Sequence, residues 1–218
     1  MKFTIQREQL LRPLQLVTGV VERRQTLPVL ANLLFKAKDN RLEITGTDLE
    51  VELVAECDAD IQQEGEATLP ARKLADIWRS LGDGAEVTVS VEADRAIVRS
   101  GRSRFTLATL PAEDFPKVPG GEADVALQLK QADVRGVIDE VGFAMAKQDV
   151  RYFLYGMLFE VTGDHIRAVA TDGHRLALST KDSSNQSVAQ RIQAIVPRKG
   201  VLELARLLDG EGETIELQ

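Results

Sequence analysis

The residues best suited to chemistry stand together in the run Thr171-Asp172-Gly173-His174. A carboxylate and an imidazole two positions apart can share a metal ion. The rest of the chain gives this interpretation little support, because it has only one other histidine, one cysteine, and no HExxH, P-loop, GxSxG or dinucleotide fingerprint. The pair Thr47-Asp48 repeats the first half of the run without the glycine and histidine. We therefore predict no catalytic residue, metal site or cofactor. One interpretation of the run is a strand-joining turn capped by His174, but residues 173–176 are specific to the second copy of the Thr-Asp pair, which favours a binding site there.

The second Thr-Asp pair belongs to an internal repeat that covers most of the chain. A shift of 124 residues places Ile5 on Leu129, Leu34-Phe35 on Leu158-Phe159, and Thr47-Asp48 on Thr171-Asp172. A shift of 126 residues places Arg72-Lys73 on Arg198-Lys199 and Asp83-Gly84 on Asp209-Gly210. Chance rarely supplies such paired polar residues in the same order, so the repeat predicts two copies of one fold.

A proline-rich connector separates the two copies. Residues 111–121 contain three prolines and two glycines. Proline fixes the backbone φ angle and cannot donate a hydrogen bond to a sheet, so this segment is expected to be semi-stiff and outside the sheets. The predicted domains are residues 1–121 and a shorter second copy, residues 122–218.

Hydrophobic spacing predicts the same order of elements in each copy. A short strand at 2–6 or 125–129 leads into a helical segment at 7–24 or 130–151. Pro13 is expected to kink the first of these helices or to delay its start. Strands follow at 33–38 and 41–47, and at 157–161 and 165–171. A second helix opens at Pro70 or Pro197, and the first copy closes with alternating strands near residues 87–91, 97 and 105–107. This order predicts an α+β fold with two helices on one face of an antiparallel sheet.

Charge is unevenly divided between the predicted helices and the remainder. Segments 7–24, 70–81, 130–151 and 197–208 hold 14 basic and 8 acidic residues, whereas the other positions hold 13 basic and 26 acidic residues. Solvation of ordinary helix surfaces is one explanation. A positive helical layer on an acidic body also suits a protein that surrounds DNA, since phosphate contacts carry no sequence information.

Composition limits the location of the protein. No run approaches the roughly 20 apolar residues that a membrane-spanning helix needs. The N-terminal residues lack the apolar core of a signal peptide, and the single cysteine, Cys57, suits a reducing compartment. We expect a cytoplasmic protein.

Several motif runs together resemble the family of bacterial DNA sliding clamps, the beta subunits of the replicative polymerase. The runs are residues 45–50 (TGTDLE), 69–73 (LPARK), 98–105 (VRSGRSRF), 148–152 (QDVRY), 171–176 (TDGHRL) and 196–200 (VPRKG). The resemblance spans essentially the whole chain. It implies a non-catalytic processivity factor, a homodimeric ring with three modules per subunit and helices lining a channel around duplex DNA. The chain departs from the family in length, because the resemblance covers two modules and a third is expected to be absent.

The resemblance also implies partners. These are sequence-independent double-stranded DNA, the DNA polymerase III core, the clamp loader, and other polymerases, ligase and mismatch-repair proteins that bind through short peptide motifs. A full-length chain is expected to form a homodimer, whereas this fragment is expected to be monomeric in dilute solution.

The resemblance assigns the candidate residues to three surfaces. The DNA candidates are Arg24, Gln148 and Tyr152, with Arg23, Lys73, Arg151, Arg198 and Lys199 as supporting charge. The partner-peptide pocket comprises Leu154, Thr171, Gly173, His174, Arg175 and Leu176. The dimer interface comprises Lys73, Arg102, Arg104, Phe105 and Leu107, and both arginines are expected to project from one strand face.

Two alternative functions differ in class from a clamp. The first is the enzyme discussed above, for which the mirrored Asp48 argues that Asp172 is structural. The second is an adaptor that binds peptides but not DNA, and salt-dependent binding of duplex DNA would distinguish a clamp from it.

Overall fold

The computed structural model describes residues 1–22, 27–116, 126–147, 151–183, 188, 190–208 and 214–217. The chain divides into two compact units, Met1–Pro119 and Gly120–Gln218. No helix in the described ranges is both long and apolar enough to cross a membrane.

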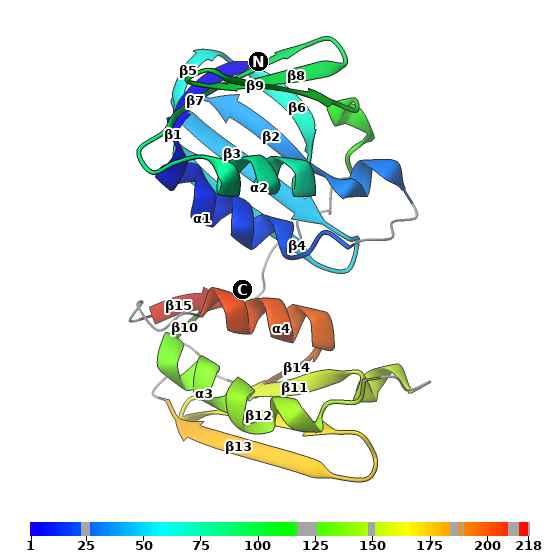
Figure 1. Cartoon of the computed structure of the whole chain (residues 1–218). Helices are drawn as coiled ribbons and strands as arrows, with labels where there is room; N and C mark the ends of the chain where they lie inside the picture. Colours follow the sequence, from blue (N-terminus) through cyan, green and yellow to red (C-terminus); the bar gives the residue numbers. More distant parts are fainter. Residues whose placement is uncertain are drawn as a thin grey trace. The chain divides into compact units, whose positions relative to one another are not determined.

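The first unit builds two antiparallel sheets and two helices (Figure 1). One sheet has the order β5-β1-β7-β8-β9, formed by Asp60–Gln63, Lys2–Gln6, Glu86–Glu92, Arg95–Ser100 and Ser103–Ala108. The other has the order β4-β3-β2-β6, formed by Glu52–Asp58, Arg41–Thr47, Asn32–Lys38 and Gly65–Pro70. The helices are α1 (Arg7–Thr18) and α2 (Ala71–Ser80), with short 3-10 turns at Pro28–Ala31 (η1) and Ala112–Asp114 (η2).

The core of the first unit joins both sheets to the helices. Phe3 of β1 and Phe35 of β2 stack with their ring centroids 6.4 Å apart, so the two sheets meet directly. Leu10 and Leu14 of α1 and Trp78 of α2 are fully buried in the same cluster. The spacing of these apolar positions therefore turns one face of each helix toward the sheets.

The second unit repeats this order over fewer strands (Figure 1). The strand β10 (Leu127–Lys130) pairs with β15 (Thr214–Leu217). The other strands form a sheet in the order β13-β12-β11-β14, formed by Leu176–Asp182, His165–Thr171, Gly156–Val161 and Ile192–Pro197. The helices are α3 (Gln131–Val141) and α4 (Arg198–Leu207), with 3-10 turns at Gly142–Ala144 (η3) and Tyr152–Leu154 (η4).

The α+β class is confirmed, and the structure corrects several boundaries. The predicted strands 2–6, 41–47 and 165–171 coincide with β1, β3 and β12. Helix α1 begins at Arg7 with Pro13 inside it, so its start is not delayed. The helical segments 7–24 and 130–151 were too long, because α1 and α3 end before Gly19 and Gly142, and glycine is a poor helix former.

Candidate functional site

The turn that joins β12 to β13 is closed by its own threonine and aspartate. The Thr171 hydroxyl donates to the carbonyl of Arg175 at 2.7 Å and accepts from the backbone N–H of Gly173 at 3.1 Å. Oδ1 of Asp172 accepts from the backbone N–H groups of His174 and Arg175, each at 3.0 Å. These N–H groups hold the pKa of Asp172 below its ordinary value, so its carboxylate is committed to the turn.

Gly173 meets two structural requirements at once. Its φ angle is +86°, a left-handed conformation that side-chain-bearing residues adopt only with strain. A Cβ atom at this position would stand 3.0 Å from Nη2 of Arg151, so the Arg151 guanidinium lies against the glycine backbone. Arg151, predicted as DNA-supporting charge, therefore lies beside the predicted pocket.

The predicted pocket residues combine exposed and buried apolar surface. Leu176 begins β13 and is 65 % exposed, whereas Leu154 is buried. His174 is exposed, and Arg175 places its guanidinium carbon 5.5 Å from the ring centroid of Phe143. Sequence reasoning missed Phe143, because no local motif marks an aromatic residue just beyond a helix as the neighbour of a distant turn.

The corresponding turn in the first unit has the same hydrogen bonds. The Thr47 hydroxyl donates to the carbonyl of Val51 at 2.9 Å and accepts from the N–H of Leu49 at 3.0 Å. Oδ1 of Asp48 accepts from the N–H groups of Glu50 and Val51 at 3.0 and 2.8 Å. The Thr-Asp pair is therefore a structural element common to both units, as the repeat predicts.

The interpretation of Asp172 and His174 as metal ligands gains no support from the described residues. Among the described residues, no group of three or more His, Cys, Asp or Glu side chains is arranged to hold a metal ion. The Nε of Arg175 also donates to the remaining oxygen of Asp172 at 3.0 Å. Both oxygens of the carboxylate are thus occupied by groups of the same turn.

Only some of the residues predicted to contact DNA lie within the described part of the chain. Arg23, Arg24 and Gln148 lie outside the described residues, and Tyr152 is described only as part of η4. Lys73 is exposed on α2, and Lys199 is partly exposed near the start of α4.

Arg198 contributes to packing within its own unit. Its guanidinium donates to the carbonyl of Met145 at 3.5 Å, and Arg72 donates to the carbonyl of Val21 at 3.3 Å. Met145 follows Val21 by 124 positions, so the same contact ties the second helix of each unit to the segment after the first helix. The positive charge of Arg198 is therefore held close to backbone.

The predicted dimer edge is only partly confirmed as an exposed surface. β9 is an edge strand that pairs with β8, and Arg104 on it is exposed. The prediction that both arginines share a strand face is wrong, because Arg102 lies in the turn before β9. Leu107 is 6 % exposed and packs in the core with the half-buried Phe105, so its side chain is not available to a partner.

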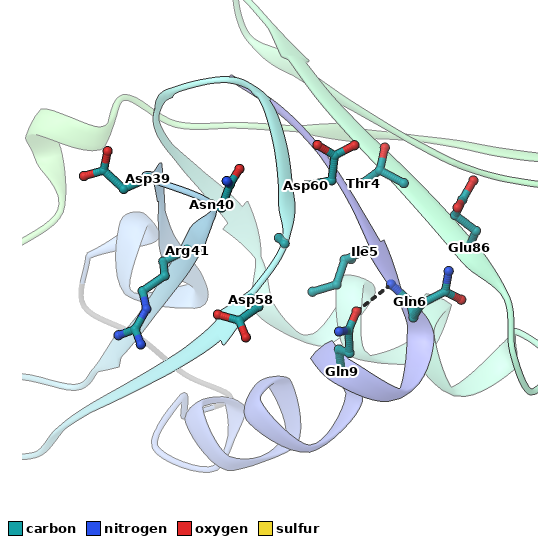
Figure 2. A pocket seen from close by; sticks show the side chains of 11 residues that line it. Thr4, Ile5, Gln6, Gln9, Asp39, Asn40, Arg41, Asp58, Asp60 and Glu86 are labelled. Atoms are coloured by element: carbon teal, nitrogen blue, oxygen red, sulfur yellow. Dashed lines mark hydrogen bonds between the residues drawn. The ribbon is translucent and has the colours of Figure 1, made fainter.

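A separate cavity of about 440 Å³ lies in the first unit and is lined by none of the predicted site residues. Figure 2 shows that its lining comes from β1, the start of α1 and the neighbouring strands and turns. Its acidic side chains are Asp39, Asp58, Asp60 and Glu86, and Arg41 supplies the cation among the described lining residues. This acidic lining does not suit phosphate.

The comparisons with known proteins agree over the whole chain. Residues 1–119 match the family model for the N-terminal domain of the DNA polymerase III beta subunit, and residues 128–218 match that for its central domain. The beta sliding clamp of Pseudomonas aeruginosa is 56 % identical over 215 residues, which are 97 % of this chain and 58 % of that protein. The beta sliding clamp of Proteus mirabilis is 52 % identical over 216 residues, covering 99 % of this chain and 58 % of the relative.

Solved structures give the same result. The Pseudomonas aeruginosa sliding clamp bound to griselimycin superposes with a TM-score of 0.94 at 54 % identity, covering 99 % of this chain and 58 % of that one. The Caulobacter crescentus clamp gives a TM-score of 0.94 at 41 % identity, covering 100 % of this chain and 60 % of that one. This chain therefore spans about 58 % of the length of the curated relatives it matches.

Proposed function

Because the chain belongs to the DNA polymerase III beta subunit family, we propose that it supplies two modules of a DNA sliding clamp. Such a clamp encircles duplex DNA and tethers the replicative polymerase to it without catalysing a reaction. In this proposal the helices α1 to α4 face the duplex, the strands face away from it, and the protein acts in the cytoplasm.

The separation of charge between helices and strands is the observation that carries the proposal. Exposed cations stand on the helices, including Arg12 on α1, Lys73 on α2 and Arg206 on α4. Positions 41–70, which span β3 to β6, contain nine acidic residues and one basic residue, Arg41. Phosphates are repelled by the strands and attracted to the helices, so a duplex is oriented without any reading of base sequence.

The salt dependence of duplex binding tests this proposal. Replacing Arg24, Lys73 or Lys199 by alanine should lower the slope of log K against log salt by about 0.9 for each phosphate that the variant no longer neutralises. The reduction should be equal for duplexes of different sequence. Gln148 carries no charge, so Gln148→Ala should weaken binding without this change in slope.

Arg41→Ala provides the matched control. Arg41 is also an exposed cation, but it lies on β3 and pairs with Glu56 at 2.8 Å. Its removal should leave the salt slope unchanged. An effect equal to that of the helix variants, or a weakening that depends on DNA sequence, would contradict the proposed use of the helices.

We further propose that the pocket around Thr171–Leu176 receives short peptides from partner proteins. The supporting features are the exposed Leu176, the buried Leu154 and the polar rim of His174 and Arg175. The partners proposed are the polymerase III core, the clamp loader, other polymerases, ligase and mismatch-repair proteins. A solved structure of the Pseudomonas aeruginosa clamp contains bound griselimycin, and we propose that in this chain griselimycin binds the pocket around Thr171–Leu176.

The edge strand β9 is proposed as the dimer contact of a longer protein. Its unpaired backbone groups, together with the exposed Arg104 and the nearby turn residue Arg102, suit an acidic strand on a partner subunit. Because such a contact is head to tail, two copies of β9 do not satisfy each other, and this chain should be monomeric in dilute solution.

A further inference from the structure

Phe143 is an exposed aromatic residue whose ring contacts the guanidinium group of Arg175. It lies in η3, directly after α3, and 61 % of its surface is exposed. The guanidinium carbon of Arg175 stands 5.5 Å from the centre of its ring, within the range of a cation–π contact. The contact joins the end of the first helix of this unit to the turn between β12 and β13.

Arg175 is held from a second direction by Asp172. Its Nε donates to Asp172 Oδ2 at 3.0 Å, while its backbone N–H donates to Asp172 Oδ1 at 3.0 Å. Within the described part of the chain, its two Nη groups donate to no acceptor. The guanidinium is therefore fixed between a carboxylate and an aromatic ring, with its outer donors unused.

The first unit has the same turn but neither member of this contact. The residue that corresponds to Arg175 is Val51, and the residue that corresponds to Phe143 is Gly19. The Thr-Asp hydrogen bonds are nevertheless the same in both turns. The turn therefore folds without the Phe143–Arg175 contact, so the contact serves something other than folding of the turn.

We propose that Phe143 is a positioning residue of the peptide pocket, which fixes the Arg175 guanidinium so that its Nη groups donate to oxygen atoms of a bound ligand. The proposal rests on the proposed peptide-binding function. An arginine side chain loses considerable conformational entropy when it is immobilised. If the side chain is already fixed before the ligand binds, this entropy loss does not reduce the binding free energy. Phe143 thus raises affinity through Arg175, whether or not it touches the ligand.

The test compares Phe143→Leu with Phe143→Tyr in the full 218-residue chain. Leucine keeps an apolar side chain without a π face, whereas tyrosine keeps the ring. The first measurement is the NMR shift of the Arg175 side-chain protons, which a ring above them moves upfield. This shift should disappear in Phe143→Leu and remain in Phe143→Tyr.

The second measurement is the affinity for griselimycin by calorimetry. Phe143→Leu should weaken binding about two- to fivefold, the equivalent of an exposed cation–π contact. Phe143→Tyr should restore the affinity, and Phe143→Leu should have no further effect in an Arg175→Ala background. A merely structural role would not give this dependence on Arg175.

The outcomes distinguish this inference from the function on which it rests. An unshifted Arg175 spectrum in wild type, or unchanged affinity in Phe143→Leu with intact binding, would overturn the inference while leaving the pocket in place. Failure of the wild-type chain to bind griselimycin would instead count against the proposed pocket. The NMR shift would still decide whether Phe143 positions Arg175.

Discussion

The turns at 47–51 and 171–175 share one set of hydrogen bonds and differ in almost everything that they display. In both, a threonine hydroxyl bridges the turn and an aspartate accepts from two backbone N–H groups. The first turn presents Leu49, Glu50 and Val51, followed by Glu52. The second presents Gly173, His174 and Arg175, followed by Leu176.

The comparison distinguishes the residues that hold the turn in shape from the residues that could contact a ligand. The shared Thr-Asp pair provides the local hydrogen bonds, so a site search based on Asp172 alone would mistake structure for chemistry. The unshared residues place an apolar side chain and a fixed guanidinium beside a glycine over which Arg151 lies. The repeat thus supplies an internal control for each residue of the second turn.

The largest effect is expected from Leu176→Asp, which should abolish ligand binding to the pocket. A carboxylate there would face apolar groups of the ligand that cannot pair it, and we expect affinity for griselimycin to fall at least about 100-fold. Circular dichroism should remain that of the wild type, since Leu176 is exposed. As a control, Leu49→Asp places the same charge on an exposed leucine of the first turn and should leave binding intact, and equal reductions in both variants would remove the distinction between the turns.

Removal of either aspartate should destabilise its own unit. Asp48→Ala leaves the N–H groups of Glu50 and Val51 without their acceptor, and the free energy of unfolding should fall by about 2 kcal/mol. Asp172→Ala should change stability in the same direction. Urea denaturation measures both effects, and a neutral Asp172→Ala beside a destabilising Asp48→Ala would show that the two turns are not equivalent.

Leu49→Gly should stabilise the first unit, although it removes a side chain. Leu49 has a φ angle of +79° and is 53 % exposed. Replacing it with glycine therefore removes little buried apolar surface and relieves the strain of a left-handed backbone conformation. The expected gain is up to about 1 kcal/mol in urea denaturation, after the entropic cost of glycine. Gly173→Ala should have the opposite sign, because it introduces that strain and a Cβ atom against Arg151. A reduced stability in Leu49→Gly would contradict the strain argument.

The smallest expected effect is the change in stability at low pH that Asp172 causes. The pKa of Asp172 is lowered on folding from its ordinary value of 3.8. Its charge therefore stabilises the folded state above that value, and this contribution is lost as the pH falls toward the lowered pKa. Asp172→Asn has no such titration. The difference in urea midpoint between wild type and this variant should therefore shrink below about pH 4, and a constant difference would show that the Asp172 charge is not used.

The sequence predicts local features well and tertiary contacts poorly. The hairpin between β2 and β3 was predictable because Asp39 and Asn40 both tolerate positive φ, and they adopt +50° and +58°. Helix ends were overestimated because Val21 and Met145 continue the apolar spacing and are buried, although they lie beyond the helices. Periodicity reports burial, and it cannot tell a helix from a following loop that packs on the same core.

The candidate site divides in the same way. The motif run located Thr171 to Leu176, but it gave no indication that Arg151 lies over Gly173 or that Phe143 contacts Arg175. Both contacts join segments that only the fold brings together. Conversely, the resemblance placed Leu107 at the dimer interface, but strand alternation turns it inward with Phe105 toward the core.

The most direct test of the account is the number and location of ligand sites on the chain. Griselimycin titrated into the 218-residue protein should bind with one molecule per chain. Backbone amide NMR signals of residues 171–178 should shift, whereas those of residues 47–54 should stay in place. Two molecules per chain, or equal shifts at both turns, would contradict the claim that a shared framework carries a binding site only in the second unit.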